Sequence, residues 1–241
     1  MKTILLTGDT GGLGVSILDV LLKKSNYKVI GISRSENQFV HMYKERYPEQ
    51  YYHISFDLRN TENIKELYTH QIKKIGSIYG LVNNSAIAYD DIVTNANISK
   101  IEDMFQLNVF APIMLTKYVI RDMLLYNIKG SIVNISSISA HTGYKGLSMY
   151  ASTKGALEAF SKGVAREWGG KGIRSNCIVP GFMETNMSST LSGQQKDKIF
   201  RRNSLSSPVS LESVASTVAF LLSEEASSIT GAMINVDNGT I

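Results

Sequence analysis

The chain has 241 residues, 43% hydrophobic and 19% charged, which is the composition of an ordinary globular protein with a sizeable core. Its formal net charge of +4 comes from 25 basic and 21 acidic residues spread along the sequence. Because no basic run or basic–aromatic strip occurs, nucleic acid is not an expected partner. The single cysteine, Cys177, excludes an internal disulfide, and the apolar part of the start MKTILLTG is too short for a secretory signal. No run approaches a membrane span, so we expect a cytoplasmic protein.

Short apolar runs alternate with amphipathic segments along the chain. The runs predict seven buried strands, in TILLT, KVIGI, YHISF, YGLVN, SIVNI, RSNCIVP and AMINV. Helical patterns lie between them, near Val15–Lys24, Thr61–Ile75, Ile101–Tyr126, Ala151–Trp168 and Leu211–Leu222. This order predicts an α/β fold: one Rossmann-like domain over residues 1–241, with a doubly wound parallel sheet and helices on both faces.

Two features interrupt this regular order. Pro112 falls inside the longest helical pattern, where it should kink the helix or mark a boundary. The polar stretch 181–208 is long and has no strand, only a short helical piece near Gln194–Arg201. Such an insertion often covers a binding site, so we expect it to serve as a substrate lid.

The segment TILLTGDTGGLG places glycines between the first strand and the first helix. Glycine there lets the backbone turn sharply and approach a pyrophosphate, whose charge faces the amides at the helix N-terminus. The spacing fits TGxxxGxG, with Gly8, Gly12 and Gly14, and equally TGxxGxxG, with Gly11 in place of Gly12. The glycines alone do not separate the two patterns.

The end of the second strand bears on the choice of dinucleotide. A dinucleotide fingerprint normally has an acid there, for the ribose diol, but VIGISRSEN has Ser33 and Arg34. Arginine suits a 2′-phosphate, so we expect NADP(H) ahead of NAD(H) as the cofactor. Glu36, two residues later, is the contrary signal.

Tyr150 and Lys154 are four residues apart and would share one face of a helix. A neighbouring ammonium favours the phenolate, so such a pair can give a proton to a carbonyl oxygen, or take one from an alcohol, near pH 7. Ser137, thirteen residues before the tyrosine, can hold the same oxygen. The spacing alone also occurs in helices where the tyrosine packs and the lysine is solvated. Here the serine ends the fifth strand and the pair opens the next helix, at the edge where α/β sheets bind ligands, which favours a nicotinamide redox site.

No metal is required for this chemistry. The four histidines and the acidic residues show no ligand spacing, so we expect no metal site.

Further motifs follow in order along the chain. They are TGDTGGLG, Asp57–Leu58, NNSA at 83–86, LNV around Asn108, the set Ser137, Tyr150 and Lys154, and PGFMET at 180–185. Together they resemble the short-chain dehydrogenase/reductase family over the whole chain. The phrases VIGISRSEN and PGFMETNM are most similar to the 3-oxoacyl-[acyl-carrier-protein] reductases of fatty acid biosynthesis. The resemblance selects the TGxxxGxG reading and implies an NADPH-dependent reduction of a carbonyl, expected to be a 3-oxoacyl thioester, to a secondary alcohol.

The resemblance also implies a role for each motif residue. Tyr150 would be the general acid, Ser137 would orient the carbonyl, and Asn108 would hold a water in a proton relay. Lys154 would bind the nicotinamide ribose and lower the pKa of the tyrosine. The remaining cofactor contacts would be Gly8, Gly12, Leu13, Gly14, Ser33, Arg34, Asp57 and Leu58 near the adenine, Asn83 in the cleft, Pro180, Gly181, and Thr185 at the carboxamide.

The chain departs from the family pattern at two places. NNSA has Ala86 where glycine is usual, which brings a methyl group into space that the cofactor uses. The tail VDNGTI has Asn238–Gly239 where a double glycine is common, which leaves the C-terminal subunit contact open.

Partners follow from the same resemblance. The reductases bind an acidic acyl carrier protein through basic residues near the entrance; Lys129 and Lys171 are candidates, although Ile128 stands where a basic residue would be expected. Arg201 and Arg202 contact an anionic substrate or form a solvated helix face. Helices equivalent to Ile101–Tyr126 and Ala151–Trp168 pair between subunits in the family, which implies a homotetramer, with a dimer as the alternative. Apolar residues beyond one helical stripe are Met104, Phe105, Leu157, Phe160 and Trp168.

Two other functions stay open. One is a reductase or dehydrogenase of a small alcohol, ketone or sugar. The other is a dinucleotide-binding sensor or scaffold without catalysis, which would not require the intact proton donor.

Overall fold

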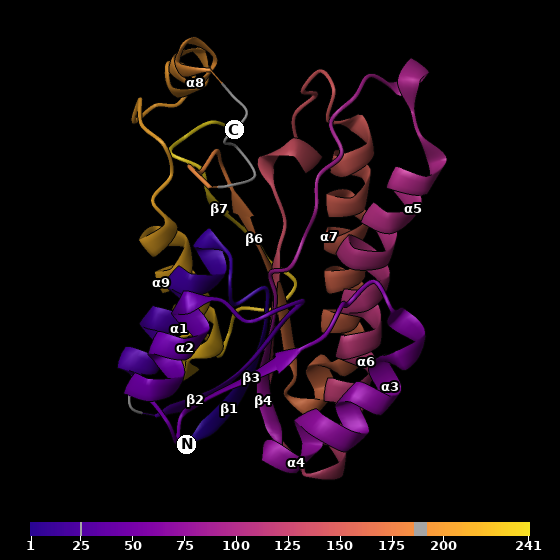
Figure 1. Ribbon diagram of the computed structural model, residues 1–241, viewed down its shortest axis with the longest axis vertical. Helices are drawn as coiled ribbons and strands as arrows, with labels where there is room; N and C mark the ends of the chain where they lie inside the picture. Colours follow the sequence, from indigo (N-terminus) through magenta and orange to yellow (C-terminus); the bar gives the residue numbers. More distant parts are fainter. Residues whose placement is uncertain (25, 186–191) are drawn as a thin grey trace.

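The computed structural model describes residues 1–24, 26–185 and 192–241. Within them the apolar runs form one parallel seven-stranded sheet in the order β3-β2-β1-β4-β5-β6-β7, which is the predicted doubly wound fold (Figure 1). The strands are β1 (Lys2–Thr7), β2 (Tyr27–Ser33), β3 (Tyr51–Ser55), β4 (Ile78–Asn83), β5 (Ser131–Ile135), β6 (Arg174–Pro180) and β7 (Met233–Val236). The chain reverses its direction of winding between β1 and β4, and that reversal creates a crevice at the carboxyl edge.

Helices cover both faces of the sheet. Figure 1 shows α1 (Gly12–Lys23), α2 (Gln38–Arg46) and α9 (Leu211–Leu222) on one face. The other face carries α3 (Ile64–Leu67), α4 (Lys73–Ile75), α5 (Ile98–Phe105), α6 (Ala111–Leu125) and α7 (Ser148–Trp168). The short α8 (Gly193–Phe200) stands beyond the carboxyl ends of the strands. None of the helices described is both long and apolar enough to cross a lipid bilayer.

Alternation along the strands divides the core into two layers. Ile4 and Leu6 of β1 pack with α1 and α9, whereas Leu5 faces α3 and α6 on the opposite side, and all three side chains are fully buried. Because both faces of the sheet are covered, its strands read as nearly continuous apolar runs.

The helix containing Pro112 is divided at the predicted place. A wide π-helical turn, η4 (Gln106–Phe110), ends α5, and Pro112 lies in the first turn of α6, where the absent amide proton breaks no hydrogen bond. A second π-helical turn, η2 (Tyr68–Ile72), interrupts the segment between α3 and α4.

Two expectations need correction or restriction. Met104 and Leu157 were named as candidate subunit contacts, but they are 0% and 2% exposed and pack inside the chain. Within α5 and η4 the exposed apolar side chains are Ile98 and Phe110. The expected lid, 181–208, includes residues 186–191, which lie outside the described part of the chain.

Candidate active site

The turn after β1 brings two glycines into backbone contact. Gly8 has φ +76°, in the left-handed region that favours glycine, and a Cβ added to Gly14 would lie 1.8 Å from the Gly8 carbonyl oxygen. The N-cap of α1, Gly11, has no capping side chain, and no acid occupies the first turn of the helix. The first amides of α1 therefore face the cavity without a side-chain partner, an arrangement suited to an anion.

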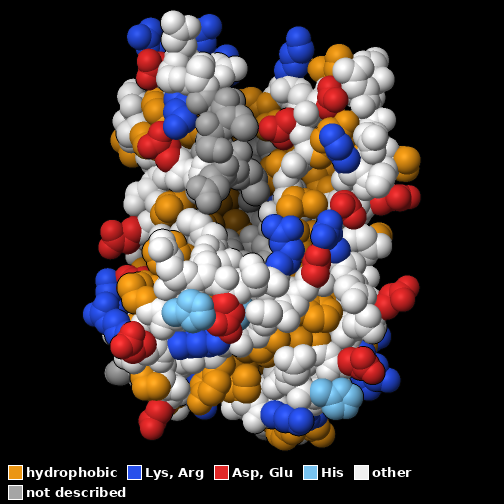
Figure 2. Space-filling model, viewed as in Figure 1, with side chains coloured by type: hydrophobic (Ala, Val, Ile, Leu, Met, Phe, Trp, Pro, Cys, Tyr) orange, Lys and Arg blue, Asp and Glu red, His pale blue; other side chains and the backbone are white. Residues whose placement is uncertain are grey.

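One cavity of about 800 Å³ extends from this turn to the start of α7. Figure 2 shows the molecule hollowed between its two upper arms, with hydrophobic side chains along the walls. The predicted residues that line the cavity are Gly8, Gly12, Leu13, Gly14, Ser33, Arg34, Asp57, Leu58, Ser137, Tyr150, Lys154, Pro180, Gly181 and Thr185. Asn83 and Asn108 are not among its lining residues.

At the end of β2, the acid and the base of the predicted 2′-subsite have different surroundings. Arg34 is exposed and forms no ion pair with the residues described. Glu36 instead pairs with Lys44 of α2, and its other oxygen lies 3.5 Å from His41 Nδ1. Glu36 is thus paired with α2, and it is not among the residues that line the cavity.

Asp57 lies on the far side of the same subsite, after β3. Arg59 holds its carboxylate at 2.7 Å, and this hydrogen-bonded pair lowers the pKa of Asp57. Arg59 also reaches Asp103 of α5 at 3.0 Å. The Asp57 carboxylate is thus ionised and fixed in direction at the edge of the cavity.

The segment NNSA after β4 uses its two asparagines differently. Asn83 is buried within the sheet and donates to Asn134 Oδ1 at 2.8 Å. Asn84 lines the cavity and donates to the Thr7 and Gly8 carbonyl oxygens at 2.9 and 3.2 Å. Asn84 therefore stabilises the glycine turn, and Ala86 lines the cavity two residues later.

Ser137, Tyr150 and Lys154 come together as the spacing predicts. Ser137 directly follows Ser136 at the end of β5, and α7 begins two residues before Tyr150. Lys154 Nζ lies 5.6 Å from the centre of the Tyr150 ring and donates to the Ile135 carbonyl oxygen at 2.8 Å. Lys154 is 2% exposed, so its charge is almost wholly removed from solvent.

Burial is the largest influence on the pKa values of both Tyr150 and Lys154. It raises the pKa of Tyr150 to about 12, while a hydrogen bond from Ser137 acts in the opposite direction. It lowers the pKa of Lys154 to about 8, which the nearby Cys177 and Glu158 partly oppose. The tyrosine is therefore protonated at neutral pH, as a proton donor must be.

Asn108 lies in the π-helical turn η4 and is 1% exposed. Its amide nitrogen donates to the Ile87 carbonyl oxygen at 2.8 Å and to Thr153 Oγ1 at 3.1 Å, and its oxygen accepts from the Ile87 amide at 2.9 Å. Thr153 in turn donates to the Tyr150 carbonyl oxygen at 2.7 Å. Asn108 thus connects the segment after β4 to the first turn of α7, with one lone pair of its oxygen left over.

Charged side chains also line the end of the cavity beyond Tyr150. Asp90 forms no hydrogen bond or ion pair with the residues described, its pKa is raised by burial, and its charge acts on Tyr150. Lys145 and Arg202 also line the cavity, whereas Arg201 does not. The two candidates for carrier contact, Lys129 and Lys171, precede β5 and β6, so they lie at the opposite, amino edge of the sheet.

Across residues 1–24, 26–185 and 192–241, no three His, Cys, Asp or Glu side chains gather in a way that could hold a metal ion. Cys177 is fully buried in β6, and burial raises its pKa to about 12.

Comparisons with known proteins agree with this architecture. A family model described as enoyl-(acyl carrier protein) reductase matches residues 12–240. The chain is 33% identical to the 3-oxoacyl-[acyl-carrier-protein] reductase of Buchnera aphidicola subsp. Acyrthosiphon pisum, over 99% of this chain and 96% of that protein. The chain belongs to the short-chain dehydrogenase/reductase family. As a short-chain dehydrogenase/reductase, it is an oxidoreductase of that type.

Solved structures of other short-chain dehydrogenases/reductases have the same fold. A 4-hydroxyisoleucine dehydrogenase complexed with NADH has a TM-score of 0.93 and 26% identity, covering 100% of this chain and 98% of that one. ElxO with NADP bound has a TM-score of 0.90 and 29% identity, covering 99% and 98%.

Three residues of the site were missed by sequence reasoning. Asn84 had a signal, because it directly follows β4 at the carboxyl edge, where α/β sheets bind ligands. The only sequence signal for Asp90 was its position, seven residues after the end of β4. Asp9, inside the glycine turn, is fully buried and hydrogen-bonded to Ser33, and no spacing rule pointed to it.

Proposed function

We propose that the protein is an NADPH-dependent carbonyl reductase that acts on a 3-oxoacyl thioester, with Tyr150 as the general acid. The observation that carries the proposal is one cavity lined by the glycine turn at one end and by Ser137, Tyr150 and Lys154 at the other. Relatives named 3-oxoacyl-[acyl-carrier-protein] reductase support the substrate class.

The residues present fit a nicotinamide dinucleotide. Gly8 and Gly14 leave no room for a side chain between them, and the free amides of α1 suit a pyrophosphate. Two structural neighbours carry NADH and NADP. When bound, the dinucleotide supplies the hydride.

The chain's own residues supply the proton and the orientation. The Tyr150 phenol gives its proton to the carbonyl oxygen, and the Ser137 hydroxyl donates a hydrogen bond to the same atom. Lys154, anchored by the Ile135 carbonyl oxygen, holds the nicotinamide ribose. Asn108 keeps the first turn of α7 in place, and the remaining lone pair of its oxygen is available to a relay water.

The other proposed cofactor contacts follow from the cavity. Asp57 would contact the adenine and Thr185 would contact the carboxamide. In the cleft, Asn84 would take the role predicted for Asn83, because Asn83 does not line the cavity. Residues 181–208 act as a lid, supported by Ile199 and Arg202 in the cavity lining.

The preference for NADPH rests on Arg34, which is exposed at the 2′-subsite while Glu36 is paired elsewhere. In Arg34→Asp, kcat/KM should fall more with NADPH than with NADH. Equal losses with both cofactors would defeat this assignment.

The central test is NADPH oxidation with a β-ketoacyl thioester and with a panel of ketones and sugars. Tyr150→Phe should lower kcat by roughly 10²- to 10⁴-fold, the usual contribution of a general acid, without loss of folding. Unchanged turnover would refute the proposed acid. Dinucleotide binding with no reduction of any carbonyl would favour the non-catalytic sensor or scaffold.

If the substrate is linked to a carrier protein, the positions of Lys129 and Lys171 bear on how the subunits are arranged. Lys129 and Lys171 lie at the edge opposite their own cavity, so they can meet a carrier at an active-site entrance only if another subunit provides that entrance. A homotetramer, with a dimer as the alternative, is supported by the exposed Ile98 and Phe110. A solution mass measurement tests the assembly. Lys129→Glu with Lys171→Glu should weaken kcat/KM for the carrier-linked thioester and spare a short free thioester.

A second candidate function is the reduction of a small polar ketone or oxidation of the matching alcohol. It is favoured by Asp90, which has no partner among the residues described and whose charge acts on Tyr150, and by Lys145 and Arg202 in the lining of the same cavity. These groups suit a substrate with hydroxyl or charged groups, and one structural neighbour is a dehydrogenase of a hydroxy amino acid. Activity on such compounds, lost in Asp90→Asn and absent on thioesters, would select this function.

The single, buried Cys177 supports a reducing, cytoplasmic location for the protein.

A further inference from the structure

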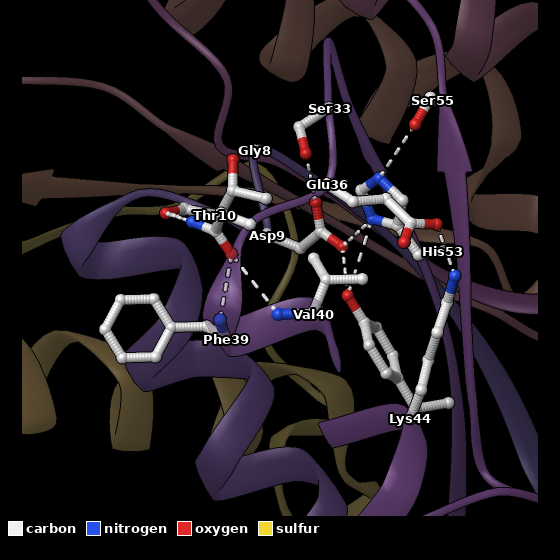
Figure 3. Close-up of polar contacts among 12 residues, drawn as sticks. Gly8, Asp9, Thr10, Ser33, Glu36, Phe39, Val40, Lys44, His53 and Ser55 are labelled. Atoms are coloured by element: carbon white, nitrogen blue, oxygen red, sulfur yellow. Dashed lines mark hydrogen bonds and ion pairs between the residues drawn. The ribbon is translucent and has the colours of Figure 1, made fainter. Parts of the chain in front are cut away.

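A buried carboxylate, Asp9, lies within the glycine turn and beside Ser33, a residue of the proposed 2′-subsite (Figure 3). Asp9 has no exposed surface, and its two oxygens meet side chains from β2 and β3. Ser33 Oγ lies 2.7 Å from Oδ1, while Tyr51 Oη and His53 Nδ1 lie 2.5 and 2.7 Å from Oδ2. The His53 side chain is also without exposed surface.

The neighbouring backbone is adapted to this carboxylate. Gly31 of β2 pairs with His53 in the sheet, and a Cβ added to Gly31 would lie 1.8 Å from Asp9 Oδ2. Only glycine leaves that space, since even a methyl group there would displace the carboxylate. The cluster is therefore a built feature of the strands rather than a surface contact.

Hydrogen-bond directions follow from the donors present. An ionised carboxylate only accepts, so Ser33, Tyr51 and His53 Nδ1 each donate to Asp9. Burial, with the Asp9 charge next in effect, raises the pKa of Tyr51 far above its usual range, so Tyr51 remains a neutral donor. The Ser33 hydroxyl uses its only hydrogen in the hydrogen bond to Asp9, so toward a ligand it can act only as an acceptor.

The second nitrogen of His53 can gain a proton without a change of partners. Nε2 lies 3.4 Å from the hydroxyl oxygen of the exposed Ser55. The hydroxyl donates to a neutral ring and accepts from a protonated one, because it can rotate. Ser55 also connects the buried ring to solvent.

Most other charged or titratable side chains near His53 are paired with side chains other than His53. Glu36 is paired with Lys44 (Figure 3). Its other carboxylate oxygen lies near His41, and Tyr43 donates to Asp19 at 3.0 Å. Arg34 is an exposed cation at the proposed subsite. Apart from each other, Asp9 and His53 form side-chain hydrogen bonds only with the hydroxyl groups of Ser33, Tyr51 and Ser55 among the residues described. The titratable and charged groups that face His53 or its neighbours are Asp9, Arg34, Glu36, His41, Tyr43, Lys44 and Tyr51.

We propose that Asp9 and His53 are a proton-linked specificity pair: binding of a 2′-phosphorylated adenosine next to Ser33 draws a proton onto His53. The inference rests on the proposed dinucleotide function. A 2′-phosphate brings negative charge toward the Asp9 carboxylate, and Ser33 has no proton with which to offset it. A proton on His53 neutralises the buried charge, and a 2′-hydroxyl makes no such demand. Both residues act through Ser33 and the local field, as positioning residues.

The test measures protons directly. Isothermal titration of the full chain with NADP⁺ and with NAD⁺, in two buffers of different ionisation enthalpy between pH 6.5 and 8.5, gives the number of protons taken up on binding. We expect a fractional uptake, up to one proton, for NADP⁺ and none for NAD⁺. The affinity for NADP⁺ relative to NAD⁺ should then fall by up to about tenfold per pH unit as the pH rises. The 2′-phosphate itself, with a second pKa of about 6, titrates mainly below this window.

A matched pair of variants assigns the proton. In His53→Asn, the amide nitrogen takes the place of Nδ1 and still donates to Asp9 but cannot ionise, so the uptake should vanish while NAD⁺ still binds. In His41→Asn, an exposed histidine is removed near Glu36, and the uptake should remain.

The possible outcomes distinguish a failure of this inference from a failure of the proposed function. Equal proton counts for the two dinucleotides, or uptake that persists in His53→Asn, would overturn the inference and leave the proposed oxidoreductase intact. Binding of NAD⁺ alone would overturn the inference together with the proposed preference for NADPH. Failure of both dinucleotides to bind would overturn the proposed function itself. The wild-type proton count needs no variant, so a folding defect in His53→Asn does not remove the test.

Discussion

Replacement of Lys154 by methionine isolates the free-energy cost of burying a cation behind the tyrosine. Burial lowers the pKa of Lys154 from its ordinary value of 10.5 to about 8. At about 1.4 kcal/mol per pKa unit, the charged lysine costs the folded protein about 3 kcal/mol at neutral pH. Methionine has a similar length without charge, but it leaves the Ile135 carbonyl oxygen without its 2.8 Å partner, a loss of about 1 kcal/mol. Lys154→Met should therefore be more stable than the wild type by about 2 kcal/mol at pH 6.5.

The sign of the pH dependence follows from the proton count. Below pH 8 the lysine is charged in both the folded and the unfolded chain, so the full cost is present. Between about pH 8 and 10.5 the folded chain has lost this proton and the unfolded chain has not, so the free energy of unfolding of the wild type rises with pH relative to the variant.

Urea unfolding at a fixed protein concentration, from pH 6.5 to 10, measures the difference. The gap should close above pH 8 and then reverse. Lys162→Met, at an exposed position of the same helix, is the control and should show no such change. A gap between wild type and Lys154→Met that stays constant with pH would refute the argument that burial sets the charge cost.

Further predictions concern packing, acidity and support of the site. Gly31→Ala should lower the free energy of unfolding by about 3 kcal/mol, because the new methyl group meets the Asp9 carboxylate. Gly163→Ala, where no atom lies within 4 Å of the added Cβ, should raise it by about 0.5–1 kcal/mol. Equal urea midpoints for the two variants would contradict this reasoning. Because the pKa of Tyr150 is about 12, the rate of carbonyl reduction should change little from pH 6 to 9. Alcohol oxidation needs the phenolate, so its rate should keep rising through pH 10. A rate of oxidation that reaches a plateau at neutral pH would show that another group is the base. Asn108→Ala removes two backbone hydrogen bonds and should cost about 2 kcal/mol in urea unfolding, with a loss of less than about 0.5 kcal/mol arguing against its supporting role.

The strands were predictable because each one is a short apolar run buried on both faces, and the order of runs and helices then specified the doubly wound sheet. The helix α2 was not predicted. Its nine residues, QFVHMYKER, bury only Val40 and Tyr43, too few for a recognisable helical stripe. The π-helical turn before Pro112 also lay beyond pattern reasoning, since hydrogen-bond spacing within a helix leaves no clear trace in hydrophobic periodicity.

The candidate catalytic group could be predicted because it depends on local geometry. A spacing of four residues places Tyr150 and Lys154 on one helix face, and the strand before that helix ends at Ile135, two residues before Ser137. The pKa values could not be predicted in this way. The sequence suggested that Lys154 lowers the pKa of the tyrosine, whereas in the folded chain burial raises it to about 12 and Ser137 provides the opposing hydrogen bond.

What the sequence by itself determined is therefore what repeats or acts over a few residues: the strands, the helix carrying the tyrosine and lysine, the glycine turn and the family. The tertiary structure decided which polar groups find partners across the sheet. Asp9 and His53 are 44 residues apart in the chain, and they touch because β1, β2 and β3 lie side by side with a glycine between them. Such contacts depend on strand order and on the space left by a missing side chain, and neither is written in the spacing of the residues concerned.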